Sequence, residues 1–320
     1  MHTRKKFIPV YLFIVFVLGF VIWVLQTPVK KMAPEPRTGE PLRVVASFYP
    51  VAEFARAVGG SFVHVETLTP NGTEPHDYEP TAEQIARIYA SDVLLFNGGG
   101  VDAWASRIAP DVSAQGVVVE ELSQVVQLLP SAPDDDHAAE DEHEESFDPH
   151  FWLNPKMVQK EIDRIEHVFS AADPANASAY KQNAEAYRTQ LDALDLAYET
   201  GLATCEKRLI VTSHGALSYL ARAYDFSVIS ISGLSPDEEP SAGRMAEVTR
   251  IAKEEQVSHI FFETLVHPKL AQTLASEIGA KTLVFNPLEG LSEEEQKQGK
   301  TYVTVMEDNL IQLKTGMLCQ

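Results

Sequence analysis

Residues 173–204 read DPANASAYKQNAEAYRTQLDALDLAYETGLAT, and this stretch decides how the rest of the chain is organised. Asp173 followed by Pro174 is typical of a helix start, because an N-cap residue precedes a proline at the first helical position. We predict a helix from about residue 175 to residue 204. Its apolar residues recur at spacings of four and three, which indicates one helix face packed against a core. That face consists of Tyr180, Ala184, Tyr187, Leu191, Leu194 and Tyr198.

Short runs that favour β-strands lie on both sides of this helix. The first set is Leu42–Ala46, Val63–Leu68, Val93–Phe96 and Val117–Val119, and the second is Leu209–Thr212, Val228–Ile231, His259–Phe262 and Thr282–Phe285. Helical patterns separate the runs within each set, which predicts parallel α/β sheets. The predicted fold class is therefore α/β, with two Rossmann-like lobes at residues 42–172 and 205–320 joined by the helix at residues 173–204.

Composition excludes several classes of protein. The 320 residues suggest two domains, and a hydrophobic content of 45% excludes global disorder. The chain has 26 Lys and Arg against 46 Asp and Glu, a net charge of −20, so a nucleic-acid partner is not expected. Cys205 and Cys319 are too few for a disulfide scaffold or a four-cysteine zinc site. Whether these two cysteines pair is left open.

The first 41 residues are predicted to be a leader and a tether. Arg4, Lys5 and Lys6 precede an uncharged apolar run, residues 7–25, which is about long enough to span a bilayer. We favour an uncleaved signal anchor over a cleaved signal peptide, and the absence of a cysteine near the end of the run excludes a lipobox. Prolines and glycine in residues 26–41 indicate a tether. Either leader places the folded part outside the cytoplasm.

An acidic segment at residues 134–147 interrupts the first lobe. Asp134 to Glu145 holds eight acidic residues, His137 and His143, and no Lys or Arg. A block of like charges predicts a solvated loop. Because imidazole and carboxylate both bind divalent metals, the segment is also a candidate for weak metal collection. Both interpretations remain open.

Three histidines lie in loop sequences close to predicted strands or turns: His76, His150 and His214. Ligands of open parallel sheets bind beyond the carboxyl ends of the strands, where His76 and His214 are predicted to lie. Two acids reach the same edge in the second lobe, Glu263 and Glu289. Three imidazoles and one carboxylate form a four-coordinate site that suits zinc. For His64, His167, His259 and His267 we favour a structural role.

The motifs around these residues carry a family resemblance. They are PHDYEP around His76, DPHFWLNP around His150, TSHGA around His214 and NPLEGL around Glu289. In this order they resemble the zinc and manganese solute-binding proteins of ABC importers, cluster A-I, and most closely the zinc-binding ZnuA/AdcA-like members. The resemblance runs from about Leu42 to the C-terminus.

The resemblance implies two α/β lobes bridged by a rigid helix, with the metal in the cleft between them. It implies His76, His150 and His214 as ligands and an acid as the fourth, for which we place Glu289 ahead of Glu263. Many relatives have an aspartate near the position of Asn286, so this chain departs from them there. The third histidine favours Zn²⁺ over Mn²⁺. A manganese-binding member of the same family remains the alternative.

The implied function is capture, not catalysis. The protein would bind Zn²⁺ outside the cytoplasm, as a monomer anchored by residues 7–25, and deliver it to a membrane permease driven by an ATPase. The rival is a zinc hydrolase with Glu74 or Glu263 as the general base, but a fourth protein ligand would occupy the position that its water needs. An adhesin is a further alternative, and no partner surface in the sequence supports it.

Overall fold

The structure is a computed structural model that describes residues 39–131, 147–236, 238–265 and 268–320. The chain divides into two units, Met1–Thr38 and Gly39–Gln320, and all described residues belong to the second. The predicted anchor at residues 7–25 and residues 134–146 of the acidic segment, with His137 and His143, lie outside the described residues, as does His267. Among the helices of the described part, none is both long and apolar enough to cross a membrane.

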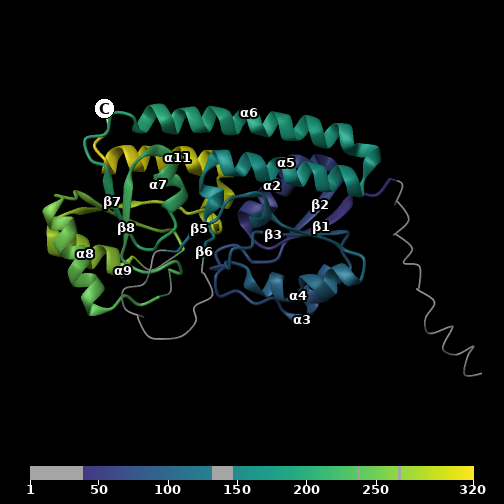
Figure 1. The fold of residues 1–320 in the computed structure, drawn as a ribbon, viewed down its shortest axis with the longest axis horizontal. Helices are drawn as coiled ribbons and strands as arrows, with labels where there is room; N and C mark the ends of the chain where they lie inside the picture. The colour runs from purple at the N-terminus through teal and green to yellow at the C-terminus, as the bar shows by residue number, and fades with distance from the viewer. Residues whose placement is uncertain (1–38, 132–146, 237, 266–267) are drawn as a thin grey trace, which may run out of the picture. The chain divides into compact units, whose positions relative to one another are not determined.

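The first lobe contains a sheet of four parallel strands in the order β2-β1-β3-β4, of which Figure 1 labels the first three. The strands are β1 (Leu42–Ala46), β2 (Val63–Thr67), β3 (Val93–Phe96) and β4 (Val118–Glu121). Their helices are α2 (Tyr49–Gly59), α3 (Ala82–Tyr89) and α4 (Ala103–Ala114). The central strand β3 is buried along its whole length, which explains its uninterrupted apolar sequence. All four predicted strands are present, although β2 and β4 differ from the predicted bounds.

The second lobe repeats this arrangement with the strand order β10-β9-β7-β8. The strands are β7 (Leu209–Thr212), β8 (Ser227–Ser230), β9 (His259–Phe262) and β10 (Lys281–Val284), and the helices are α7 (Ser218–Tyr224), α8 (Ala242–Glu254) and α9 (Lys269–Ile278). Here β8 and β10 begin one residue before the predicted runs. The α/β class with two parallel sheets is therefore confirmed.

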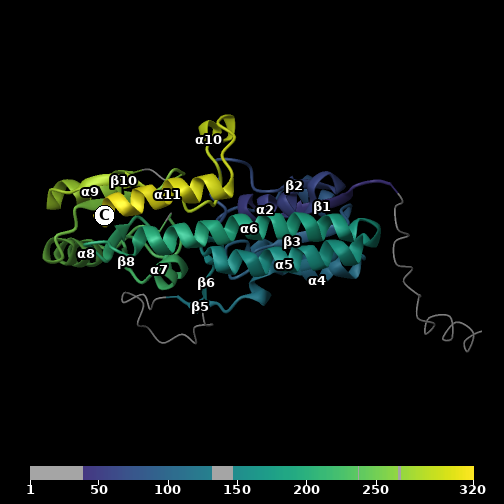
Figure 2. The same cartoon turned by 90° about the horizontal axis from the view of Figure 1, so that it is seen from above.

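The predicted long helix is α6 (Ala177–Leu202), 26 residues or about 39 Å at 1.5 Å per residue. It runs along both lobes and packs on α2 and α5 (Pro155–Ala172) of the first and on α11 (Tyr302–Gly316) of the second (Figures 1 and 2). Every residue of its predicted apolar face is buried. The helix begins two residues after the predicted start, because a 3₁₀ turn, Pro174–Asn176, precedes it. The carboxylate of Asp173 instead accepts bonds from the side chains of Asn176 and Tyr180.

Shorter elements complete the described chain. The strands β5 (Leu129–Pro130) and β6 (Phe147–Asp148) pair antiparallel on either side of the acidic segment, and the 3₁₀ turn Phe151–Leu153 leads into α5. Two further 3₁₀ turns are Gly60–Phe62 and Leu122–Val125. The short helix α10 (Glu293–Lys297) projects from the second lobe in Figure 2. These elements were not predicted from the sequence.

A disulfide joins Cys205 and Cys319. It connects the segment after α6 to the segment after α11, where Lys207 N–H also donates to the Met317 carbonyl at 2.9 Å. The pairing that the sequence left open is therefore made in the structure. It ties the C-terminus to the end of the long helix.

Candidate metal centre

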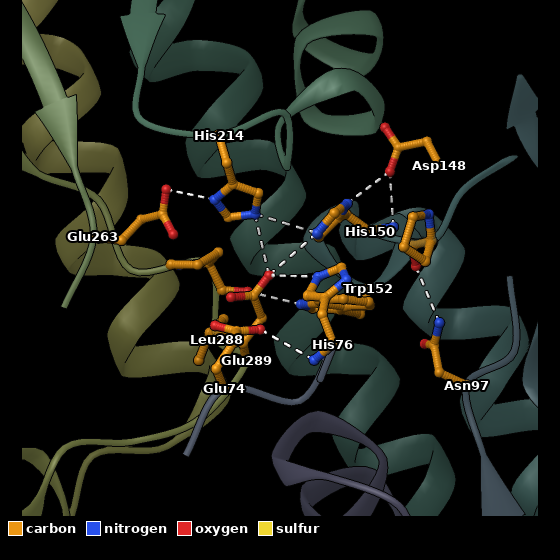
Figure 3. Close-up of polar contacts among 12 residues, drawn as sticks. Glu74, His76, Asn97, Asp148, His150, Trp152, His214, Glu263, Leu288 and Glu289 are labelled. Carbon is orange, nitrogen blue, oxygen red and sulfur yellow. Dashed lines mark hydrogen bonds and ion pairs between the residues drawn. The ribbon is translucent and has the colours of Figure 1, made fainter. Parts of the chain in front are cut away.

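Four residues from four separate loops converge at one point between the two lobes. His76 lies in the loop between β2 and α3, His150 follows β6, His214 follows β7 and Glu289 follows β10. One ligand atom from each lies within 4.8 Å of the others. Figure 3 shows the four side chains pointing toward one another. These are the three histidines and the preferred acid that the sequence singled out.

Four of the six distances between these atoms have the size of the edges of a coordination tetrahedron, and the other two are at most 4.8 Å. The Oε1 atom of Glu289 lies 3.4 Å from His76 Nε2, 3.1 Å from His150 Nε2 and 3.2 Å from His214 Nε2. The Nε2 atoms of His150 and His214 are 3.4 Å apart. Ligands about 2.0–2.1 Å from a tetrahedral ion lie roughly 3.3 Å from one another. The four atoms thus surround a position that fits one zinc-sized ion.

The His150 ring is oriented by Asp148, a residue that the sequence analysis missed. The Oδ1 atom of Asp148 lies 2.9 Å from the His150 backbone nitrogen and 2.8 Å from its Nδ1. A proton on Nδ1 leaves the lone pair of Nε2 free for a metal. The preceding residue, Pro149, is held through its carbonyl by Asn97 Nδ2 at 3.1 Å. The DPH motif itself, with an acid two residues before the histidine, was the available signal.

Glu263 plays the corresponding part for His214. Its Oε1 atom lies 2.5 Å from His214 Nδ1 and also accepts a bond from the Ser213 hydroxyl. The structure therefore places Glu263 on the nitrogen that faces away from the cluster, and Glu289 on the nitrogen that faces into it. Both imidazoles of the buried pair, His150 and His214, have a carboxylate at Nδ1, which is the usual arrangement of metal-binding histidines.

His76 is less buried than the other two histidines. Its backbone N–H donates to the Glu74 carboxylate at 3.2 Å, within the same loop. The loop is also tied to the sheet, because the Tyr78 hydroxyl donates to the Leu68 carbonyl at 2.9 Å. The side chain of His76 is 11% exposed, whereas those of His150 and His214 are 0% exposed. His76 is therefore the ligand nearest to solvent.

Asn286, where many relatives were expected to carry an aspartate, does not join the cluster. Its Oδ1 accepts the Leu288 N–H at 2.7 Å, and its Nδ2 donates to Glu295 of α10 at 2.8 Å. Its side chain thus shapes the turn that leads to Glu289.

Charge is concentrated around this position. Burial alone would lower the pKa of His214, but Glu263 and Glu289 outweigh it and raise the pKa well above the ordinary 6.5. Burial likewise opposes the charge on His150, whose pKa is raised by its bonds to Asp148 and Glu289. Burial lowers the pKa of His76. The metal-free cluster therefore attracts protons to the two buried rings.

Burial and the neighbouring charged groups also shift the pKa values of the acids near the cluster. Burial would raise the pKa of Glu289, but His214 and the bonds from His150, His214 and His76 hold it well below its usual range. Burial and the nearby Glu289 raise the pKa of Glu74 to about 9. One buried carboxylate oxygen in each of Glu74, Asp148, Glu263 and Glu289 has no hydrogen-bond partner among the described residues. Such oxygens favour a cation nearby.

The other histidines lie apart from the cluster. His64 on β2 and His167 on α5 are exposed, and His259 on β9 contacts the hydroxyl of Ser258 through Nδ1 at 2.9 Å. None of these three belongs to the metal-binding group found among the described residues. The structural roles favoured for them stay predictions.

Comparison with known proteins gives a consistent result. Residues 44–316 match the family described as ZnuA, zinc-uptake complex component A, periplasmic. The zinc-binding lipoprotein AdcA of Streptococcus pneumoniae is 41% identical over 277 residues, which cover 85% of this chain and 55% of that protein. The high-affinity zinc uptake system protein ZnuA of Bacillus subtilis is 39% identical over 290 residues, which cover 88% and 89%.

Solved structures agree with these sequence matches. The Zn(II)-bound ZnuA-like domain of Streptococcus pneumoniae AdcA superposes with a TM-score of 0.75 at 38% identity, covering 87% of this chain and 99% of that one. The chain spans little more than half the length of the full AdcA protein.

Proposed function

Because this chain belongs to the ZnuA family of zinc-uptake components, we propose that it captures Zn²⁺ outside the cytoplasm and delivers it to an ABC-type membrane permease driven by an ATPase. His76, His150, His214 and Glu289 are the proposed ligands, and Zn²⁺ is the cargo. The observation that carries the proposal is the convergence of three imidazole nitrogens and one carboxylate oxygen within 4.8 Å of one another, with four of their separations between 3.1 and 3.4 Å.

The donor set favours zinc over manganese. Three neutral imidazoles and one carboxylate in a tetrahedron suit Zn²⁺, whereas Mn²⁺ is better served by more oxygen ligands in an octahedron. The carboxylates at Nδ1 of His150 and His214 strengthen both rings as ligands. Mn²⁺ is thus the weaker competitor for the same position.

Capture is favoured over hydrolysis by the number of donors. A catalytic zinc keeps one coordination position for water, and here a fourth protein donor stands at that position. Glu263, one of the two acids considered as a general base, is engaged with His214 and Ser213. We therefore expect saturable metal binding without turnover of ester or peptide substrates.

Uptake and release need a path for the ion. The partial exposure of His76, beside three side chains exposed by 1% or less, places that path on the His76 side of the cluster. Loss of one exposed ligand would leave a three-donor site that binds more weakly. Delivery is thus expected to begin with movement of the His76 loop.

The cellular setting is proposed from the sequence. Residues 7–25 would anchor a monomer at the membrane where the permease lies, and His137 and His143 of the acidic segment would collect metal weakly. The two roles are separable from the zinc site, since both concern residues outside it.

The test is metal analysis of untagged protein, followed by competition between Zn²⁺ and Mn²⁺ with a chelator as the reference. One zinc per chain, retained in the presence of excess Mn²⁺, is the expected result. Stoichiometric Mn²⁺ that Zn²⁺ fails to displace would contradict the zinc assignment. If the protein holds neither metal after equilibration with both, the capture function itself is contradicted.

A further inference from the structure

The backbone of Asn286 lies just past the end of β10, an edge strand of the second sheet. The N–H of Phe285 donates to the Phe262 carbonyl of β9 at 2.9 Å. Because backbone groups alternate sides along a strand, the N–H and C=O of Asn286 face away from β9, on the side where the described sheet has no further strand. They need partners from another element.

Asn309 of α11 supplies both partners. Its Oδ1 accepts the N–H of Asn286 at 2.9 Å, and its Nδ2 donates to the Asn286 carbonyl at 2.7 Å. The side chain therefore imitates a neighbouring strand for this one residue. Asn309 is only 3% exposed, and a buried amide is costly unless it is hydrogen-bonded, so these two bonds explain an asparagine inside an otherwise apolar helix face.

The turn held in this way is strained. Leu288 has a φ of +62°, in the left-handed region that non-glycine residues seldom adopt. Such a conformation persists only where the surroundings enforce it. Here the N–H of Leu288 is held by Asn286 Oδ1 at 2.7 Å, and the next residue along the chain is Glu289. The direction in which Glu289 leaves the turn thus depends on Asn286 being fixed.

The same helix also reaches the ligand loop of the first lobe. The hydroxyl of Tyr302, the first residue of α11, donates to the Trp152 carbonyl at 2.8 Å, two residues after His150. Trp152 in turn donates from Nε1 to the carbonyl of Pro287 at 2.8 Å. The helix α11 therefore holds the loops of two proposed ligands that come from different lobes.

We propose that Asn309 is a positioning residue for zinc binding, which fixes the Asn286–Glu289 turn so that the Glu289 carboxylate meets the three imidazoles. This rests on the function proposed above. Asn309 itself contacts no ligand atom of the cluster. Its contribution to zinc affinity passes through Glu289.

The test is a double-mutant cycle on zinc affinity, measured by chelator competition in the full chain. Asn309→Leu removes both bonds at similar volume and is expected to weaken zinc binding by up to about 10- to 100-fold, the loss caused by removing a direct partner of a ligand, because the Glu289 carboxylate is no longer held in place. In a Glu289→Ala background the same substitution should change the affinity by less than about 2-fold, because the carboxylate that it positions is gone.

A matched control separates positioning from stability. Leu313→Ala removes a buried apolar side chain one turn further along α11 and should lower the melting temperature while leaving the zinc affinity of the folded protein unchanged. If Asn309→Leu does not fold, Asn309→Asp takes its place, because it keeps the acceptor for the Asn286 N–H but sets an oxygen against the Asn286 carbonyl.

Three results would overturn the proposal. They are wild-type zinc affinity in a folded Asn309 variant, an equal loss of affinity with and without Glu289, or an equal loss in Leu313→Ala. If the wild-type protein and its Asn309 variants bind zinc equally tightly, only this inference is refuted. A wild-type protein that binds no zinc would remove the proposed function as well.

Discussion

The Nε2 atoms of His150 and His214 face each other at 3.4 Å, although the two residues are 64 positions apart and come from different lobes. Each ring has a carboxylate at its other nitrogen, Asp148 for His150 and Glu263 for His214. With a proton on each Nδ1, both lone pairs point at the same space. A cation between them, or a proton on one of them, relieves that repulsion, so metal and protons compete for this pair.

The three histidines should contribute to zinc affinity individually. Replacing His76, His150 or His214 with Ala removes a nitrogen ligand from a four-member shell. The zinc affinity of each variant should therefore fall by more than roughly 100-fold, the upper range for loss of a hydrogen-bond partner of a ligand. The measurement is chelator competition. His64→Ala and His167→Ala are the controls, since both side chains are exposed and lie outside the cluster. Unchanged affinity in all three ligand variants would refute the site.

Glu289→Gln and Glu263→Gln should differ in severity. The first removes the only negative charge among the proposed ligands, whereas the second weakens the partner of His214 Nδ1. We expect the larger loss for Glu289→Gln and a loss of about 10- to 100-fold for Glu263→Gln. Zinc titrations of both variants test the order. A reversed order would make Glu263 the fourth ligand.

Zinc affinity should fall as the pH is lowered, and the fall should begin above pH 6.5. The pKa of His214 and that of His150 are raised in the metal-free cluster, so protons occupy these rings at a higher pH than a free imidazole would allow. Zinc must displace them, and the binding constant decreases once the pH drops below the raised pKa. Titrations from about pH 8 to about pH 5, with proton release measured in two buffers, check this. A flat profile would argue against a histidine site.

The acidic segment should affect the rate of capture more than the equilibrium. Deleting residues 134–145 removes eight acids, which should slow zinc association at low ionic strength. Added salt should shrink the difference, because exposed charges are screened over about 10 Å at 0.1 M. Stopped-flow mixing with a zinc indicator gives the association rates of the wild type and of the deletion variant. Equal association rates at low salt would leave the segment as a solvated linker.

The disulfide should stabilise the fold without tuning the metal site. It closes a loop with a sequence separation of 114, and its removal in Cys205→Ser/Cys319→Ser should lower the free energy of unfolding by about 2–4 kcal/mol. Urea unfolding of the metal-free protein measures this, with wild type under reducing conditions as the matched control. Zinc affinity of the folded variant is expected to stay at the wild-type value. Equal stability of the oxidised wild type and the variant would contradict the expectation.

Local patterns in the sequence were enough to predict the architecture. The apolar spacing of α6, from Tyr180 to Tyr198, and the short β-rich runs depend on side chains close in the chain, so periodicity reveals them. The start of α6 lies two residues later than predicted, because a 3₁₀ turn precedes the helix and Asp173 bonds to the Asn176 and Tyr180 side chains. The proposed ligands were found because the motifs around the three histidines and Glu289 resemble those of a known family.

Only the tertiary structure decided how those loops meet. Glu263 and Glu289 both follow strands of the same sheet, and nothing in their spacing tells which one faces into the cluster. The choice is made by the turn that Asn309 holds and by the packing of both lobes along α6 and α11. Contacts of this kind join residues far apart in the chain, so they depend on how whole elements pack and leave no periodic signal in the sequence.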